Sequence, residues 1–261
     1  MRKIKVFRKS NVKLANRKRR LRIALRSLLG IVVLAAIVLG LRQVGMHLDS
    51  LQIHQVQVSG IEAPLTSEKV IELTGIQVGM PILGVDLVQA VAKLRENPWI
   101  DKVKVGRRLP HTLLIELTPH QPKMILSFGQ FYYLGSKGEV FKELKGKTDS
   151  RDFPYLTGLS REEIEQDPPR AKEVFDQALK LLAAYEKLGI SKELGLSEIH
   201  YDKGQGYSFY PEKFHMRVKV GFEDFDQKLS RLTQAYEKLK ESNRSFASMD
   251  LNYEGKVILT M

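Results

Sequence analysis

The sequence predicts an α+β protein. It has a single transmembrane helix, then a small strand–helix–helix–strand–strand domain, then a larger domain in which two helices cover a mixed, mainly antiparallel sheet. Three observations lead to this prediction. An uncharged apolar stretch follows a strongly basic arm. After it come one strand-like run, two helical stripes and two more alternating runs. The remaining chain alternates short strand-like runs with two amphipathic helices, which is typical of a sheet covered by helices. The predicted boundaries are 1–26 (basic cytoplasmic arm), 27–45 (transmembrane helix), 50–118 (first domain) and 119–261 (second domain).

Charge and hydropathy define the predicted membrane span. Residues 1–26 hold twelve Lys and Arg and no acidic residue, and residues 27–41 carry no charge. Fifteen helical residues cover only about 22 Å of a roughly 30 Å hydrocarbon core, so the apolar residues just before them are needed as well, with Arg22 and Arg26 reaching the headgroups. The positive-inside rule places the arm in the cytoplasm. Because the arm is long for a signal peptide and no A-x-A site follows Leu41, we interpret the segment as an uncleaved signal anchor.

The net charge of +12 belongs to the arm. The arm holds twelve of the 42 basic residues, which leaves 30 for the rest of the chain against 30 acidic ones. A basic arm beside a span is expected to contact anionic lipid headgroups, and no nucleic acid is expected as a partner. The chain has no cysteine, which excludes disulfides, thiol catalysis and cysteine–zinc sites.

Local signals define the elements of the first domain. The alternating run 53–58 reads as a strand. Thr66 and Asp86 are expected to cap the N-termini of two helices, the first of which ends at Gly75. Residues 107–111 are expected to form the hairpin between two further strands. The apolar residues at helical or strand spacing are Val70, Ile71 and Leu73, then Leu87, Val88, Val91 and Leu94, then Val103, Val105, Leu113, Ile115 and Leu117.

The second domain carries two clear helical stripes. Asp167-Pro168 reads as the N-cap and first residue of one helix, which Gly189 closes, and Asp224 as the cap of the other. Their inward faces are Val174, Ala178, Leu181, Tyr185 and Leu188, and Phe225, Leu229, Leu232, Tyr236 and Leu239. The strand-like runs are 124–128, 131–134, 196–201, 207–211, 216–220, 246–253 and 256–261.

The residues that could carry chemistry do not form an active site. None of the six histidines falls at H-x-x-x-H or H-E-x-x-H spacing, so neither a metal nor a cofactor is expected. Glu223, Asp224 and Asp226 could serve acid–base chemistry on glycans, but acidic residues at a helix start are better explained by the helix dipole. We therefore expect that the protein is not an enzyme.

Six short motifs, in order along the chain, resemble the FtsQ/DivIB family of bitopic bacterial cell-division proteins. Two residues depart from the family pattern: Pro119 stands in place of a usual Glu, and Asn252 in place of a usual Arg. The motifs are V-x-V-x-G at 56–60, N-P-W-I at 97–100, R-L-P-H-T-L at 108–113, Y-L-G-S-K-G-E-V-F at 133–141, P-Y-L-T-G at 154–158 and M-D-L-N-Y at 249–253.

The resemblance implies a fold and a function. The first domain would be a POTRA domain and the second an FtsQ-type β-domain. The protein would be a non-enzymatic scaffold of the divisome in the bacterial inner membrane, with a cytoplasmic N-terminus and a periplasmic C-terminus. At the septum it would recruit and link early and late division proteins. FtsB- and FtsL-like partners would bind the C-terminal edge strand, and further division proteins would bind the POTRA domain.

The end of the chain carries the predicted partner-binding residues. Residues 256–261 read as a strand that pairs back to 246–253 through a two-residue turn. Such a terminal strand exposes the backbone groups of one edge. Only one charged residue, Lys256, is present in it to prevent unwanted strand pairing. The resemblance makes Tyr253 the anchor of the interface, because tyrosine buries large area at low entropic cost. The predicted partner-binding residues are Tyr253, Glu254, Gly255, Lys256, Val257, Ile258 and Leu259.

Two other functions fit a domain outside the membrane. One is a membrane-anchored peptidoglycan-modifying enzyme, which the missing nucleophile and metal patterns disfavour. The other is a POTRA-type periplasmic chaperone, which would need a barrel or several POTRA copies, whereas only about 140 residues follow a single copy.

Overall fold

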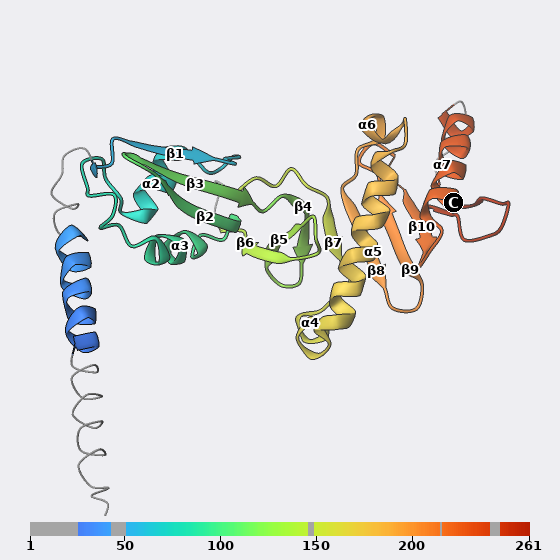
Figure 1. The fold of residues 1–261 in the computed structure, drawn as a ribbon. Helices are drawn as coiled ribbons and strands as arrows, with labels where there is room; N and C mark the ends of the chain where they lie inside the picture. Colours follow the sequence, from blue (N-terminus) through green and yellow to red (C-terminus); the bar gives the residue numbers. More distant parts are fainter. Residues whose placement is uncertain (1–25, 43–50, 146–148, 215, 241–245) are drawn as a thin grey trace, which may run out of the picture. The chain divides into compact units, whose positions relative to one another are not determined.

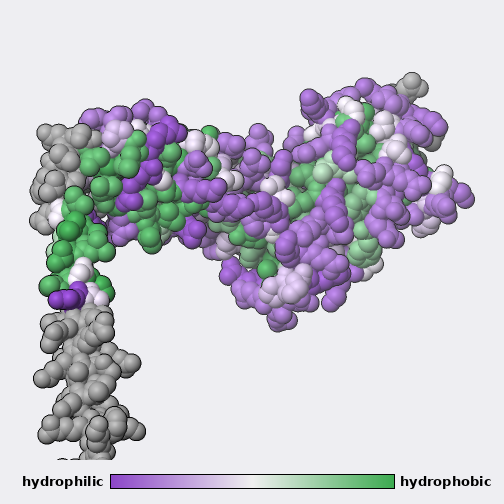
Figure 2. All heavy atoms as spheres, in the orientation of Figure 1, coloured by the Kyte–Doolittle hydropathy of each residue, from purple (hydrophilic) through white to green (hydrophobic). Residues whose placement is uncertain are grey.

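The computed structural model describes residues 26–42, 51–145, 149–214, 216–240 and 246–261 (Figure 1). Residues 26–42 form a helix whose large apolar side chains are exposed, and its surface is largely hydrophobic in Figure 2. Among the described residues, no helix combines the length and the apolar character that crossing a bilayer requires. The predicted arm up to residue 25 and the predicted end of the span, 43–45, lie outside the described residues.

The chain divides into two compact units. The first contains the chain up to residue 96 together with 102–117, and the second contains 97–101 and 118–261. In the first unit, the sheet order is β1–β3–β2, with β1 parallel to β3 and Gln55 opposite Thr112. The predicted strand–helix–helix–strand–strand order is confirmed. The elements are β1 (Gln55–Ser59), α2 (Ser67–Thr74), α3 (Leu87–Arg95), β2 (Ile100–Arg108) and β3 (Thr112–Pro119).

The helices of the first unit begin where the capping residues predict. The Lys69 amide donates to Thr66 Oγ1 at 3.3 Å, and Gly75 ends α2 with a φ of +72°. The amides of Val88 and Gln89 donate to Asp86 Oδ1 at 2.9 and 3.1 Å. Each cap satisfies backbone groups that the helix itself leaves without partners. Local polar chemistry therefore fixes where both helices begin.

The second unit is a nine-stranded sheet in the order β12–β11–β10–β9–β8–β7–β4–β5–β6. The pairs β4–β7, β7–β8 and β10–β11 are parallel and the others antiparallel, so the predicted mixed, mainly antiparallel sheet is confirmed. The strands are β4 (Pro122–Ser127), β5 (Phe131–Gly135), β6 (Val140–Glu143), β7 (Tyr155–Thr157), β8 (Glu198–Asp202), β9 (Gly206–Tyr210), β10 (Arg217–Gly221), β11 (Ser248–Asp250) and β12 (Ile258–Thr260).

Helices α5 (Pro168–Glu186) and α7 (Phe225–Lys240) bury their predicted apolar faces in the main core of this sheet (Figure 1). Leu181, Leu229, Leu232 and Phe209 are fully buried there. The helix α5 starts at Pro168 with Asp167 as its N-cap, as predicted. It ends at Glu186, however, so the predicted end at Gly189 is wrong. The Ser191 hydroxyl donates to the Leu188 carbonyl at 2.7 Å and lies 3.2 Å from the Glu186 carbonyl, so its single hydrogen serves the chain just beyond the helix end.

The sequence did not predict two short helices, α4 (Arg161–Gln166) and α6 (Ser191–Leu194). A second, smaller cluster of buried residues lies apart from the main core, formed by Ile125, Tyr133 and Leu144. Trp99 packs against it, with its ring centroid 5.3 Å from that of Tyr133. Trp99 is therefore a packing residue of the second unit.

Candidate partner-binding edge

The strand β12 is the last strand on its side of the nine-stranded sheet. It pairs antiparallel with β11, with Met249 opposite Leu259 and Asp250 opposite Ile258. The Thr260 carbonyl accepts a hydrogen bond from the Ala247 amide at 2.8 Å, so the backbone of Thr260 faces β11. Because strand residues alternate, the N–H and C=O groups of Leu259 point away from the sheet. The edge therefore offers a donor and an acceptor to an incoming strand.

The connection between β11 and β12 differs from the prediction. The turn lies at Glu254-Gly255 as expected, with the Lys256 amide donating to the Tyr253 carbonyl at 3.3 Å. The predicted strands 246–253 and 256–261 are too long, however, because the ladder pairs only the residues of β11 and β12, with one further backbone bond from Ala247 to Thr260. Gly255 has a positive φ of +64° and Glu254 does not. Type I′ and II′ turns match the twist of paired strands, and both need a positive φ at the first central residue, which here is Glu254. This turn is therefore of another type, and the strands do not stay paired up to it.

A second cause is Arg231, on α7. Its Nη1 donates to the Tyr253 carbonyl at 2.6 Å and its Nη2 to the Leu251 carbonyl at 2.7 Å. Both carbonyls belong to the connection, so the guanidinium holds this segment against the helix instead of leaving it to pair as a strand. Charge-assisted hydrogen bonds of this kind are stronger than neutral ones. We call this pair of bonds the Arg231 clamp.

The far end of α7 is also anchored. Lys240 Nζ and the Tyr236 hydroxyl donate to Glu193 Oε1 at 2.9 and 3.1 Å. The hydrogen bond from Lys240 is the main reason why the pKa of Glu193 lies below its usual value. Glu193 therefore stays ionised near neutral pH and ties α6 to α7.

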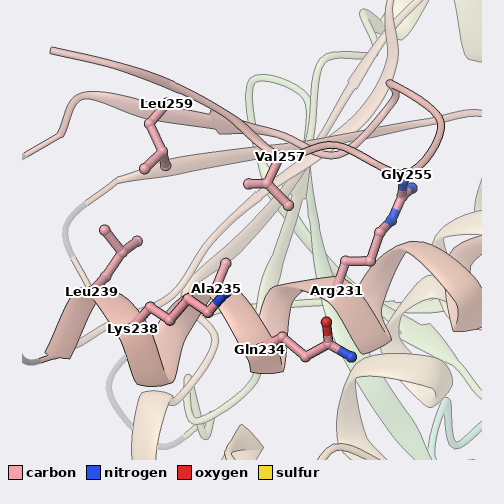
Figure 3. A pocket seen from close by; sticks show the side chains of 8 residues that line it. All are labelled: Arg231, Gln234, Ala235, Lys238, Leu239, Gly255, Val257 and Leu259. Carbon is pink, nitrogen blue, oxygen red and sulfur yellow. The ribbon is translucent and has the colours of Figure 1, made fainter.

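A groove of about 360 Å³ lies between α7 and the terminal strand (Figure 3). Val257 and Leu259 point from the strand toward the helix, and Arg231 reaches up toward Gly255. Of the described residues that line the groove, two are cationic and none is acidic. Together the groove and the edge offer backbone pairing, apolar side chains and positive charge. The groove is lined by Arg231, Gln234, Ala235, Lys238, Leu239, Gly255, Val257 and Leu259.

Comparison with known proteins agrees with both units. Residues 51–120 match the family model described as "POTRA domain, FtsQ-type", and residues 125–252 match "Cell division protein FtsQ/DivIB, C-terminal". The cell division protein FtsQ of Geobacter sp. (strain M21) is 35% identical over 209 residues, which cover 80% of this chain and 76% of that protein. The chain belongs to the FtsQ/DivIB family of cell-division proteins.

Two further FtsQ/DivIB proteins show the breadth of the likeness. FtsQ of Geotalea daltonii is 33% identical over 208 residues, covering 80% of this chain and 75% of that protein. Cell division protein DivIB of Geobacillus kaustophilus is 28% identical over 205 residues, covering 78% and 70%. The match to the C-terminal FtsQ/DivIB model stops at residue 252, just before the predicted partner-binding residues.

The structure brings together three of the predicted residues, Gly255, Val257 and Leu259, along the groove. Tyr253 lies in the connection and is 52% exposed, and Ile258 is exposed on the other side of the strand. The prediction missed the floor of the groove on α7. Positions 231, 234, 235 and 238 share one helical face beside the apolar stripe of α7. That shared face is the only feature of the sequence that could have indicated these groove residues.

Asn252, where the FtsQ/DivIB pattern usually has Arg, has a structural role here. Its side-chain Oδ1 accepts a hydrogen bond from Lys228 Nζ at 3.3 Å. Its backbone N–H donates to Asp250 Oδ1 at 2.9 Å. Lys228 also donates to the Val220 carbonyl at 2.9 Å. Asn252 thus joins the end of β11 to α7 and β10. Pro119, the other departure, is the last residue of β3.

Proposed function

We propose that this FtsQ/DivIB protein is a membrane-anchored, non-enzymatic scaffold of the bacterial divisome that recruits and links division proteins at the septum. Membership of a cell-division family supports the cellular role. The observation that carries the scaffold role is the outward-facing backbone of Leu259 at the sheet edge. A strand added there would gain ladder hydrogen bonds, which is a common way for proteins to capture extended peptides.

The partner that we propose for this edge is an FtsB-like protein associated with an FtsL-like one. An extended segment would pair with β12 and place an apolar side chain in the groove beside Val257 and Leu259. The cationic lining, Arg231 and Lys238, favours acidic residues in that segment. The POTRA domain, proposed as residues 50–118, would bind further division proteins at the β1 or β2 edge of its sheet, and the β-domain would span 119–261.

Depletion of the protein tests the scaffold role against the enzymatic alternative. A scaffold's loss is expected to give filamentous, undivided cells whose glycan strands keep their composition, since no bond in the wall is made or cut by the protein. The measurement is microscopy together with chromatography of digested peptidoglycan. Altered glycan products that appear before any division defect would favour the enzyme.

The anchor that we propose is residues 27–45, with the arm in the cytoplasm. The exposed apolar side chains of the helix over 26–42 and the arm's charge asymmetry support this topology. Because the chain has no cysteine, single cysteines at Ser10 and Ser150 report on topology directly. On intact spheroplasts, a membrane-impermeant thiol reagent is expected to label position 150 and not position 10. The reverse pattern would disprove the orientation.

Tyr253 is the proposed anchor residue of the interface. Its exposed ring stands beside the turn, so Tyr253→Ala is expected to weaken partner binding by at least about 2 kcal/mol, measured by calorimetry with a peptide or the purified partner. Phe222→Ala, which truncates another exposed aromatic ring outside the predicted interface, is the matched control and is expected to change binding little. Circular dichroism and melting must match the wild type for both variants. Wild-type affinity in a folded Tyr253→Ala protein would reject Tyr253 as the anchor.

A further inference from the structure

The first unit has a distinct end at which the chain enters it. Residues 51–54 lie between two turns there, the α2–α3 connection and the β2–β3 hairpin (Figure 1). The Ile53 amide donates to the Met80 carbonyl, and the Gly79 amide donates to the Ile53 carbonyl, both at 2.8 Å. On the other side, the His54 amide donates to the His111 carbonyl at 2.9 Å. We call residues 51–54, 76–85 and 107–111 the entry end.

Exposed apolar side chains gather at this end. Val78 and Met80 in one turn are 67% and 37% exposed, and Leu109 in the other is 60% exposed. Residues 73–85 contain no charged side chain, although 28% of the whole chain is charged. A soluble loop of this length ordinarily carries charge, so the absence of charge marks the surface as one that contacts something less polar than water.

The apolar turn is held in place. Arg107 Nε donates to the Ile82 carbonyl at 2.7 Å, and its Nη2 donates to the Val85 carbonyl. These bonds, with the two at Ile53, fix the turn on both sides, so little conformational entropy would be lost when its tip is buried. Asp86, the acidic residue that follows this turn in the sequence, has its carboxylate engaged by the amides at the start of α3.

An exposed arginine at the entry end fits a lipid phosphate. Arg108, His54 and His111 are exposed, and the two imidazole rings stack with centroids 5.0 Å apart. Apolar tips beside a cationic side chain are the pattern of a surface that lies in the headgroup region of a bilayer. A protein partner would instead be expected to meet a broader apolar core with a polar rim.

The length of chain brings a bilayer within reach. This step rests on the proposed anchor, whose span ends at residue 45. Five residues, 46–50, separate it from Leu51, and this connection covers at most about 20 Å when fully extended. The chain leaves the first unit at the opposite end of the sheet, because β3 runs parallel to β1 and ends there. The entry end is thus the part of the folded unit that the anchor holds closest to the membrane.

We propose that the entry end docks on the lipid bilayer that carries the anchor, with Val78, Met80 and Leu109 inserted among the headgroups and Arg108 facing their phosphates. The occupant is the membrane surface itself. The docking would fix the tilt of the first unit and so leave the β1 and β2 edges of its sheet accessible from the side.

Site-specific fluorescence on the full-length chain tests the proposal, since any cysteine introduced is the only one. Val78→Cys is labelled with nitrobenzoxadiazole and the protein is reconstituted into phosphatidylethanolamine–phosphatidylglycerol vesicles. Some of these vesicles contain lipid with a nitroxide near the headgroup. Quenching and a blue-shifted emission are expected at position 78. Ser59→Cys, at the far end of β1 and also exposed, is the matched control and is expected to show neither.

Vesicle flotation separates the two levels of the proposal. If the protein floats with the vesicles but position 78 is quenched no more than position 59, the anchor stands and bilayer docking is overturned. If the protein does not float, the anchor fails and docking fails with it. Met80→Asp in the labelled Val78→Cys protein is expected to abolish the quenching without affecting flotation. Quenching that persists in this variant would show that the apolar tip is not inserted.

Discussion

Leu259→Pro is expected to weaken partner binding at least about a hundredfold, on the order of 3 kcal/mol, while leaving the fold intact. The N–H of Leu259 points away from β11, so its loss removes nothing from the protein's own ladder. Proline is tolerated on an edge strand when its nitrogen faces solvent. An incoming strand, in contrast, would lose one donor and meet the proline ring at the pairing face. Calorimetry or surface plasmon resonance with the purified partner measures the effect.

Ile258→Pro provides the matched control. The backbone of Ile258 faces Asp250 on β11, so proline there removes a hydrogen bond of the protein's own sheet. Hydrogen exchange distinguishes the two variants. The Ser248 and Asp250 amides are expected to stay protected in Leu259→Pro and to lose protection in Ile258→Pro. Unchanged binding by a Leu259→Pro protein with protected amides would mean that this edge does not pair with the partner.

Elements set by nearby residues could be predicted from the sequence. The starts of α2, α3 and α5 are each fixed by one side chain, Thr66, Asp86 and Asp167, that bonds an amide within three residues. The apolar stripes of α5 and α7 likewise repeat within one helix and pack against one core. In such segments, local chemistry and the buried face agree, so a sequence pattern is enough to identify them.

Elements set by distant residues could not. The strand β7 has only three residues and exists because it pairs on both sides, with Leu156 opposite Leu126 and Ile199. No period can be recognised over three residues. The candidate site divides in the same way. The terminal edge strand could be read from 256–261, but the groove beside it depends on Arg231, twenty residues before the carbonyl of Leu251 that it binds.

Removing the Arg231 clamp is expected to free the connection from α7 and to weaken partner binding with it. Arg231→Met keeps most of the aliphatic stem and removes both donors to the Leu251 and Tyr253 carbonyls. Hydrogen bonds from charged groups contribute about 1.5–3 kcal/mol each. Against this, Arg231 Nε is buried and has no hydrogen-bond partner among the residues that the structure describes, which costs about 1–3 kcal/mol and is relieved in the variant. The expected net loss is therefore about 2 kcal/mol of unfolding free energy, measured by urea denaturation.

Two variants make the result specific. Gln234 lies one turn further along the same face of α7 and lines the groove without belonging to the clamp. Gln234→Met is therefore expected to leave the unfolding free energy nearly unchanged. Arg231→Lys keeps the charge but cannot bond both carbonyls in the forked geometry of Arg, so it is expected to fall between wild type and Arg231→Met. Because the clamp sets the path of the chain into β12, the affinity for the partner is expected to follow the same order. If stability and affinity are the same in Arg231→Met as in the wild type, the sheet alone positions β12 and the clamp has no part in presenting its edge.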